Sequence, residues 1–279
     1  MRFEIVTIFP GFFAGIFEHG IVRRAQAEGL VTVGVHDLRA FTHDRHRTVD
    51  DRPFGGGEGM VLKAEPLAEA LVGLGIATKA ERRRGDPRTR VILLSAQGKP
   101  FTQSVARDLA RLDSIVLICG RYEGVDERIN QLYCDQELSI GDYVLSGGEL
   151  AAAVVVDAVM RLVPGVLGNE ASGEFESFGV ADGEIAATED GVPRSQHGAG
   201  GLLDYPHYTR PAEFGGLRAP EVLMNGDHAE IRRWRREQQL RKTLANRPDL
   251  LERAALSKED LRVLEAIRAE TRGSDSFES

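Results

Sequence analysis

The alternation of strand-length apolar runs with stretches of helical spacing constrains the fold of this chain more than any other feature. Strands are expected at residues 3–9, 30–35, 91–94 and 114–119, and helices at 12–28, 66–74, 102–112 and 149–162. Parallel neighbours in a sheet need crossover connections of about this length, usually helical. The pattern therefore predicts an α/β fold with a mostly parallel sheet.

The composition changes after Gly168. Residues 169–201 contain seven acidic residues, one arginine and repeated glycines, so this segment can bury little apolar surface and is expected to be a flexible linker. Beyond it, capping patterns at Asp227 and Ser257 indicate the starts of helices. We predict an α/β domain over 1–168, an acidic linker over 169–201, a helical domain over 202–272 and a tail over 273–279.

The overall composition is that of an ordinary globular chain, with 42% hydrophobic and 28% charged residues. No apolar run approaches the roughly 20 residues that span a bilayer, and the N-terminal run has no small-residue cleavage site of a secretory signal. The two cysteines, Cys119 and Cys134, fit a reducing compartment and have no metal-finger spacing. We therefore expect a cytoplasmic protein without a membrane partner.

Charge is unevenly distributed along the chain. The net charge of −8 is unfavourable for nucleic-acid binding, yet six of the twelve residues in 231–242 are basic. A second basic cluster occupies 79–90, before a predicted strand. Composition alone leaves two alternatives open for both clusters, contact with phosphates or an ordinary solvated face.

Three loops that follow predicted strands are the strongest signs of a binding site. They cover 94–98, 119–128 and 139–149, and all contain glycine. In open α/β sheets, ligands bind outside the carboxyl ends of the strands, and glycine lets the backbone approach a ligand closely. Neither GxGxxG nor a Walker lysine pattern occurs, which argues against a dinucleotide or nucleoside triphosphate. The alternative, glycines that serve only as turns, weakens with three such loops in series.

A fourth glycine-rich segment, residues 50–60, is interpreted as either a mobile surface loop or a loop that grips a substrate. Together with the loops it resembles the bacterial tRNA (guanine-N1)-methyltransferases of the SPOUT class, over nearly the whole chain. The resemblance rests on DRPFGGG at 51–57, CGRYEGVDER at 119–128, SIGDYVLSGGE at 139–149, PHYTRP at 206–211 and HAEIRRWR at 228–235.

The resemblance implies a SPOUT-type sheet with a C-terminal trefoil knot formed by the three loops, and a small helical C-terminal domain. It implies that S-adenosylmethionine binds in the knot, and that its methyl group is transferred to N1 of the tRNA guanosine immediately 3′ of the anticodon. A homodimer with active sites between subunits is also implied.

Carried over position by position, the resemblance implies a cofactor pocket with apolar walls for adenine and backbone groups for its ring nitrogens. The implied cofactor residues are Leu94, Ser95, Gly120, Tyr122, Gly124, Ser139, Ile140, Gly141, Asp142, Tyr143, Val144, Leu145, Gly147 and Gly148. Ordinary core packing remains an alternative role for the aliphatic members. The implied RNA contacts are Arg52, Gly55, Gly56, Gly57, Arg232, Arg233, Arg235 and Arg236.

Methylation of guanine N1 requires loss of its proton, so a general base near N1 and a cation near O6 would both lower the barrier. The resemblance assigns the cation to Arg161. It places the base before Ser177 and Phe178, where this chain has Glu176 in place of the family's usual aspartate. Asp190, in an apparent insertion over 179–200, is the rival base.

Other departures keep further alternatives open. Glu58 stands where the family generally has proline, which affects the shape of the glycine-rich loop. The resemblance also implies Mg²⁺, but no ligand spacing fixes a metal site, although Glu123 is a candidate contact. The alternative functions are a catalytically inactive SPOUT-like RNA-binding protein and a SPOUT enzyme acting on another RNA nucleotide.

Overall fold

The structure is a computed structural model that describes residues 1–168, 176–179 and 200–275. The chain divides into two compact units, 1–168 and 169–279, which are described separately. Among the described residues, no helix has both the length and the apolar character needed to cross a membrane.

The first unit is built on a five-stranded sheet in which all neighbouring strands are parallel, with the order β2-β1-β6-β5-β7. The strands are β1 (Arg2–Thr7), β2 (Thr32–Asp37), β5 (Thr89–Pro100), β6 (Ser114–Cys119) and β7 (Gln136–Ser139). Every residue of the central strand β6 is buried, as expected where helices cover both faces of a parallel sheet. The predicted α/β class with a mostly parallel sheet is confirmed.

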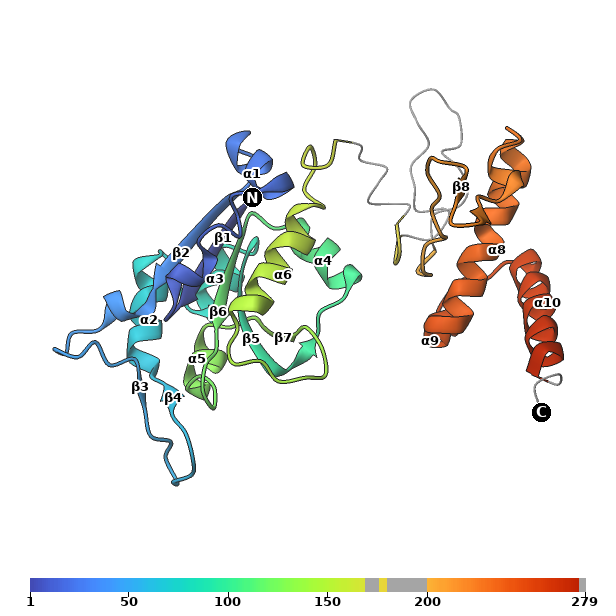
Figure 1. Cartoon of the computed structure of the whole chain (residues 1–279). Helices are drawn as coiled ribbons and strands as arrows, with labels where there is room; N and C mark the ends of the chain where they lie inside the picture. Colours follow the sequence, from blue (N-terminus) through green and yellow to red (C-terminus); the bar gives the residue numbers. More distant parts are fainter. Residues whose placement is uncertain (169–175, 180–199, 276–279) are drawn as a thin grey trace. The chain divides into compact units, whose positions relative to one another are not determined.

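Helices cover both faces of this sheet (Figure 1). Ile115 and Leu117 face a core that includes α1 (Gly20–Ala27), α4 (Gln103–Ala110) and α6 (Glu149–Met160). Val116 and Ile118 face a second core with α2 (Ala64–Gly73) and α5 (Glu127–Leu132). The period-two alternation of a strand thus divides one continuous apolar run between two cores.

Two expectations about this unit were wrong in their bounds. The predicted helix over 12–28 is a 3-10 turn, η1 (Pro10–Phe13), followed by turns and then α1. The break contains Gly15, and Gly20 begins α1; both have positive φ. The loop expected after Leu94 belongs to β5, but both Leu94 and Lys99 pair with Leu138, so the intervening residues bulge out of the ladder.

A long hairpin projects from the first unit (Figure 1). Its two short strands, β3 (Asp50–Asp51) and β4 (Val61–Leu62), pair antiparallel. The glycine-rich segment between them forms the tip. At the base, Leu62 makes a parallel bridge to Val125, so the hairpin is attached to the loop that follows β6. A second 3-10 helix, η2 (Leu38–Phe41), precedes the hairpin.

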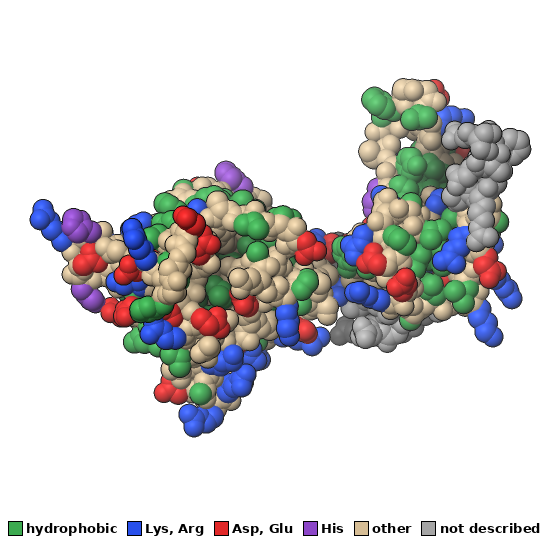
Figure 2. All heavy atoms as spheres, turned by 90° about the horizontal axis from the view of Figure 1, so that it is seen from below, with side chains coloured by type: hydrophobic (Ala, Val, Ile, Leu, Met, Phe, Trp, Pro, Cys, Tyr) green, Lys and Arg blue, Asp and Glu red, His purple; other side chains and the backbone are tan. Residues whose placement is uncertain are grey.

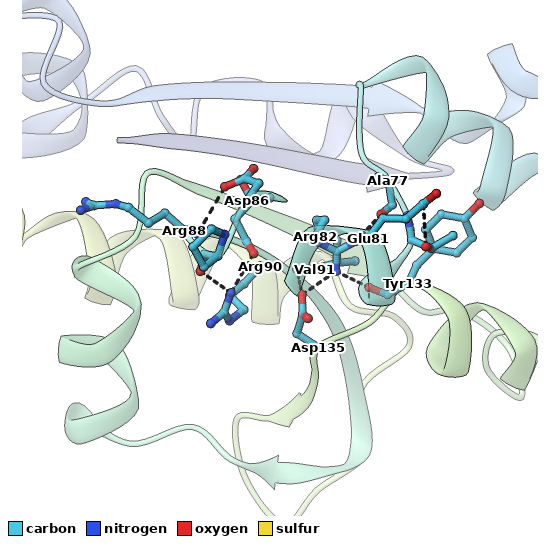
Figure 3. A network of polar contacts seen from close by, with 12 residues as sticks. Ala77, Glu81, Arg82, Asp86, Arg88, Arg90, Val91, Tyr133 and Asp135 are labelled. Atoms are coloured by element: carbon cyan, nitrogen blue, oxygen red, sulfur yellow. Dashed lines mark hydrogen bonds and ion pairs between the residues drawn. The ribbon is translucent and has the colours of Figure 1, made fainter. Parts of the chain in front are cut away.

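The basic cluster at 79–90 contains one buried structural arginine. Arg82, on α3 (Lys79–Gly85), is 4% exposed, and its guanidinium lies 2.6 Å from the Asp135 carboxylate. It also donates to the carbonyls of Ala77 and Tyr133, while Asp135 accepts from the Val91 backbone N–H (Figure 3). This network joins α3 to β5 and to the turn before β7, so it is a structural feature.

The second unit is mainly helical, with α8 (His228–Asn246), α9 (Pro248–Leu251) and α10 (Lys258–Asp275). Its small core contains Leu202, Leu240, Leu251, Leu264 and Ile267. Asp227 caps α8 by accepting from two backbone N–H groups, which confirms this predicted helix start. The hairpin of β8 (Glu213–Phe214) and β9 (Leu217–Arg218) and the 3-10 turn η3 (Glu221–Leu223) have no counterpart in the sequence-based prediction.

The start of α10 is fixed by a reciprocal cap and an ion pair. Ser257 and Asp260 each donate a backbone N–H to the other's side chain, as the spacing predicts. Arg236 of α8 forms two bonds to the same carboxylate, at 2.7 and 3.0 Å. Burial by itself would raise the pKa of Asp260, but the bonds from Arg236 and Ser257 outweigh it and hold the pKa below its ordinary value.

We predict that Arg82→Ala lowers the free energy of unfolding by about 3–5 kcal/mol, because it leaves the Asp135 carboxylate buried without its ionic partner. Urea denaturation followed by circular dichroism would measure the change. The control is Arg83→Ala, an exposed neighbour on the same helix, where a change within about 0.5 kcal/mol is expected. Equal effects of the two substitutions would contradict the structural role of Arg82.

Candidate active site

The loops after β5, β6 and β7 meet at the carboxyl ends of these strands and enclose a cavity of about 300 Å³. The lining includes every predicted cofactor residue except Asp142. These residues are Leu94, Ser95, Gly120, Tyr122, Gly124, Ser139, Ile140, Gly141, Tyr143, Val144, Leu145, Gly147 and Gly148. The structure therefore gathers segments far apart in the sequence into one site, and leaves Asp142 outside the lining.

The cavity also contains charged side chains that were not assigned to it from the sequence. Glu123, Glu127 and Glu137 line it together with Arg121. Glu123 had been considered only as a metal contact. The position of these glutamates in the sequence could have indicated that they line the site. Glu123 and Glu127 lie in the motif after β6, and Glu137 lies in β7. With three glutamates and one arginine, the charged residues that line the cavity are negative in sum, which favours a ligand with positive charge.

A buried carboxylate links the loops at the base of the site. Glu149, in the first turn of α6, is 1% exposed and accepts a hydrogen bond from the Thr7 hydroxyl at 2.7 Å. The Arg121 guanidinium lies 3.1 Å from the same carboxylate and 4.6 Å from the centre of the Phe9 ring. The N-terminus of a helix favours negative charge, which stabilises the Glu149 carboxylate at the start of α6. Through its contacts with Thr7 and Arg121, Glu149 joins the end of β1 and the loop after β6 to the start of α6.

Two glycines allow the loop before α6 to cross the loop after β6 at close range. Gly148 donates its N–H to the Gly120 carbonyl at 2.9 Å. A Cβ atom at position 148 would lie 2.7 Å from Cα of Cys119, and one at 147 would lie 2.2 Å from Nε of Arg121. At position 148 the obstacle is backbone, which cannot move aside as a flexible side chain can.

The thiol of Cys119 lies beneath this crossing. Burial, and then the negative charge of Glu149, raise the pKa of the Cys119 thiol well above its ordinary value. Cys134 is also buried, and burial raises its pKa to about 12. Both cysteines are therefore thiols at neutral pH.

The hairpin of β3 and β4 is bonded to the cavity wall through its base. The Glu123 N–H donates to the Met60 carbonyl at 3.0 Å, and the Leu62 N–H donates to the Gly124 carbonyl at 3.0 Å. The predicted RNA contacts of the hairpin, Arg52 and Gly55 to Gly57, lie nearer its tip and are exposed. The structure thus places them outside the cavity, on a hairpin whose base is hydrogen-bonded to the cavity wall.

The two predicted catalytic residues belong to different units. Arg161 is the C-cap residue of α6 in the first unit. Glu176 belongs to the second unit, in a short segment whose Ser177 hydroxyl accepts the Asp204 N–H and whose Phe178 N–H donates to Leu202. The rival base Asp190 lies outside the described residues.

The four arginines predicted to contact RNA on α8 differ in their surroundings. Arg232 and Arg233 are exposed, and the Arg235 guanidinium lies 4.8 Å from the centre of the Tyr205 ring. The Arg236 guanidinium, by contrast, forms an ion pair with Asp260, and both side chains are largely buried. We therefore revise the expectation for Arg236, because its donors already hold α8 to α10.

Within the part of the chain that the structure describes, no cluster of three or more His, Cys, Asp or Glu side chains is arranged to hold a metal ion. A second contact for a metal beside Glu123 is thus not assigned.

Comparison with known proteins identifies the class of this site. The sequence model of the family "tRNA (Guanine-1)-methyltransferase TrmD" matches residues 1–253. Relatives named tRNA (guanine-N(1)-)-methyltransferase include one from Koribacter versatilis, 56% identical over 96% of this chain and 99% of the relative. Those from Geobacter metallireducens and Chloroflexus aggregans are 48% and 49% identical, with 95% of this chain and 96% and 94% of the relatives covered. The chain belongs to the tRNA (guanine-1)-methyltransferase family.

We predict that Gly148→Ala forces the two crossing loops apart, lowers the free energy of unfolding by about 1–3 kcal/mol and abolishes ligand binding in the cavity. Thermal denaturation and calorimetric titration with S-adenosylmethionine would measure the two effects. The control is Gly85→Ala, where a Cβ meets nothing within 4 Å. Wild-type affinity in Gly148→Ala would show that the close crossing does not shape the cavity.

Proposed function

We propose that this protein transfers the methyl group of S-adenosylmethionine to N1 of the tRNA guanosine immediately 3′ of the anticodon. The observation that carries the proposal is the cavity enclosed by three glycine-containing loops at the carboxyl ends of β5, β6 and β7. Membership of the family, and relatives named for this reaction, support the same activity.

The chemistry of the cavity fits S-adenosylmethionine. Leu94, Ile140 and Leu145 supply apolar surface for an adenine ring, and the loop backbones supply groups for its nitrogens. The carboxylates of Glu123, Glu127 and Glu137 balance the positive charge of a sulfonium. A volume of about 300 Å³ is at the lower end of the range for small-molecule sites.

Glu176 is proposed to accept the N1 proton of guanine, and Arg161 to stabilise the negative charge that develops on O6. S-adenosylmethionine supplies a methyl group on a sulfonium, which becomes a neutral thioether when the C–S bond breaks. The new N1–C bond forms from the electron pair that the departing proton leaves behind, so the methylated base is neutral and the proton rests on Glu176. The cavity walls would hold the donor in line with N1.

The remaining groups serve recognition. Arg232, Arg233 and Arg235 are proposed to contact tRNA phosphates, which positions the RNA but does not read its sequence. The domain division at 168 and 201 is part of the same proposal, with the helical domain as the tRNA-binding part. The predicted end of that domain at 272 is too early, because α10 continues to Asp275. Mg²⁺ is included without an assigned site, and the cytoplasm is the proposed location because the substrate is tRNA.

A homodimer is proposed from the exposed face of α6. Leu150 and Val154 are 50% and 46% exposed, and with Asp157 and Arg161 they form one stripe along the helix, since residues three or four apart share a face. The opposite face is buried in the core. Exposed apolar surface rimmed by polar residues is typical of an interaction site, and here Leu150 and Val154 are followed along the helix by Asp157 and the proposed catalytic Arg161.

One observation favours a second function. The base position holds glutamate where the family usually has aspartate, so its carboxylate lies one methylene farther from the backbone. A SPOUT-like protein that binds tRNA without methylating it is therefore the alternative. A single turnover of methyl transfer by the purified protein would exclude it.

We predict that Glu176→Gln lowers the rate of methyl transfer to a tRNA transcript by about 10²- to 10⁴-fold, because an amide cannot accept the N1 proton. Labelled S-adenosylmethionine with Mg²⁺ gives the rate, and Asp190→Asn, the matched control, should retain it. A transcript with adenine in place of the target guanine should accept no label. Loss of activity in Asp190→Asn alone would move the base to Asp190.

We predict that Leu150→Glu converts a dimer into monomers, because it places a charge in an apolar interface. Sedimentation velocity would measure the change. Val72→Glu is the control, since Val72 is 64% exposed on α2 and lies outside the stripe. A wild-type protein that sediments as a monomer, or a Leu150→Glu variant that stays dimeric, would contradict this interface.

A further inference from the structure

The tip of the β3–β4 hairpin carries the most exposed large apolar side chain of the described residues. Phe54 is 99% exposed. The residue before it is Pro53 and the three after it are glycines, so the adjacent positions carry little that could cover the ring. Single apolar side chains on a surface are ordinary, so the placement of this one must supply the argument.

The hairpin is fixed to the wall of the cavity. Besides the bonds from Glu123 to Met60 and from Leu62 to Gly124, the Asp126 N–H donates to the Leu62 carbonyl at 3.0 Å. A Cβ atom at Gly59, which has a positive φ, would lie 2.4 Å from the Glu123 carboxylate. Because Glu123 and Gly124 line the cavity, the element that presents Phe54 starts at the edge of the site.

The side chains near the tip indicate the kind of ligand. Arg52 is exposed, and its guanidinium has no hydrogen-bond or ionic partner among the described residues. An exposed aromatic ring next to a free arginine matches an unpaired nucleotide, whose base stacks on the ring while its phosphate meets the cation. A protein partner would instead favour a wider apolar patch, whereas the sequence neighbours of Phe54 at the tip are Arg52, Pro53 and three glycines.

We propose that Phe54 is a stacking platform for an unpaired tRNA base next to the target guanine, and that Arg52 contacts the adjoining phosphate. The inference rests on the proposed function, because it takes tRNA as the substrate. Phe54 is a positioning residue in this scheme. It fixes the RNA loop at the edge of the cavity and takes no part in proton or methyl transfer.

The test uses the full-length protein and anticodon stem-loop RNAs that carry 2-aminopurine at either nucleotide beside the target guanine. Stacking on an aromatic ring changes the fluorescence of this base. Phe54→Ala is expected to weaken RNA binding by about 5- to 100-fold and to abolish the fluorescence change at one position. Phe54→Tyr should keep both, because the ring is retained, whereas Phe54→Leu should behave like Phe54→Ala.

Kinetics with the tRNA transcript give a second readout. Phe54→Ala should raise KM for tRNA while kcat at saturating tRNA stays within about twofold, which is the signature of lost substrate binding with intact chemistry. The affinity for S-adenosylmethionine should be unchanged. Val72→Ala removes a 64% exposed side chain on α2 and controls for loss of surface apolar area, so it should match the wild type throughout.

The outcomes separate this inference from the proposed function. Wild-type protein that fails to methylate tRNA would overturn the function, while a fluorescence change that depends on Phe54 would still support stacking. Unchanged affinity and fluorescence in Phe54→Ala would overturn the stacking role, and so would full rescue by Phe54→Leu. A changed sedimentation coefficient of Phe54→Ala would assign Phe54 to a contact between chains and would also overturn it.

Discussion

The arrangement of the cavity depends on one buried ionic interaction, that of Glu149 with Arg121 and the Thr7 hydroxyl. A carboxylate that is 1% exposed is tolerated only when its charge is matched and its oxygens accept hydrogen bonds. Because the three partners come from the end of β1, the loop after β6 and the start of α6, satisfying this one charge fixes the positions of three segments. The same arrangement requires glycine at positions 147 and 148, because Arg121 and the Cys119 backbone occupy the space that a side chain would need there.

The fold class and the location of the site follow from local sequence patterns, but several details do not. Strand-length runs between helices predict the parallel sheet, and loops after strands predict the edge at which the cavity lies. The break of the 12–28 helix depends on the backbone conformation at Gly15, and the bulge of β5 on that between Leu94 and Lys99. A hydrophobic pattern encodes neither. The site residues came from resemblance to a family, and Glu127 and Glu137 were missed because carboxylates on a solvated face look the same in sequence.

The arginines show most clearly that local sequence does not determine whether a charged side chain is buried or exposed. Arg82 and Arg83 are neighbours in a basic run, yet the first is buried against Asp135, 53 residues away, and the second is exposed. On α8, Arg236 holds α10 through Asp260, while Arg232 and Arg233 are exposed. A long-range partner decides each case, and only the fold supplies it. A net charge of −8 is therefore compatible with local surfaces that attract phosphate.

The position of Cys119 has a chemical consequence for a site that is proposed to hold an alkylating agent. A methyl sulfonium reacts with any well-placed nucleophile, and a thiolate is among the best that a protein can offer. Cys119 ends the strand beneath the crossing loops, but burial and the charge of Glu149 keep it protonated. Burial is the main cause of this shift, and Cys119 does not line the cavity, so the strand that ends at the site keeps its strong nucleophile unreactive and away from the proposed methyl donor.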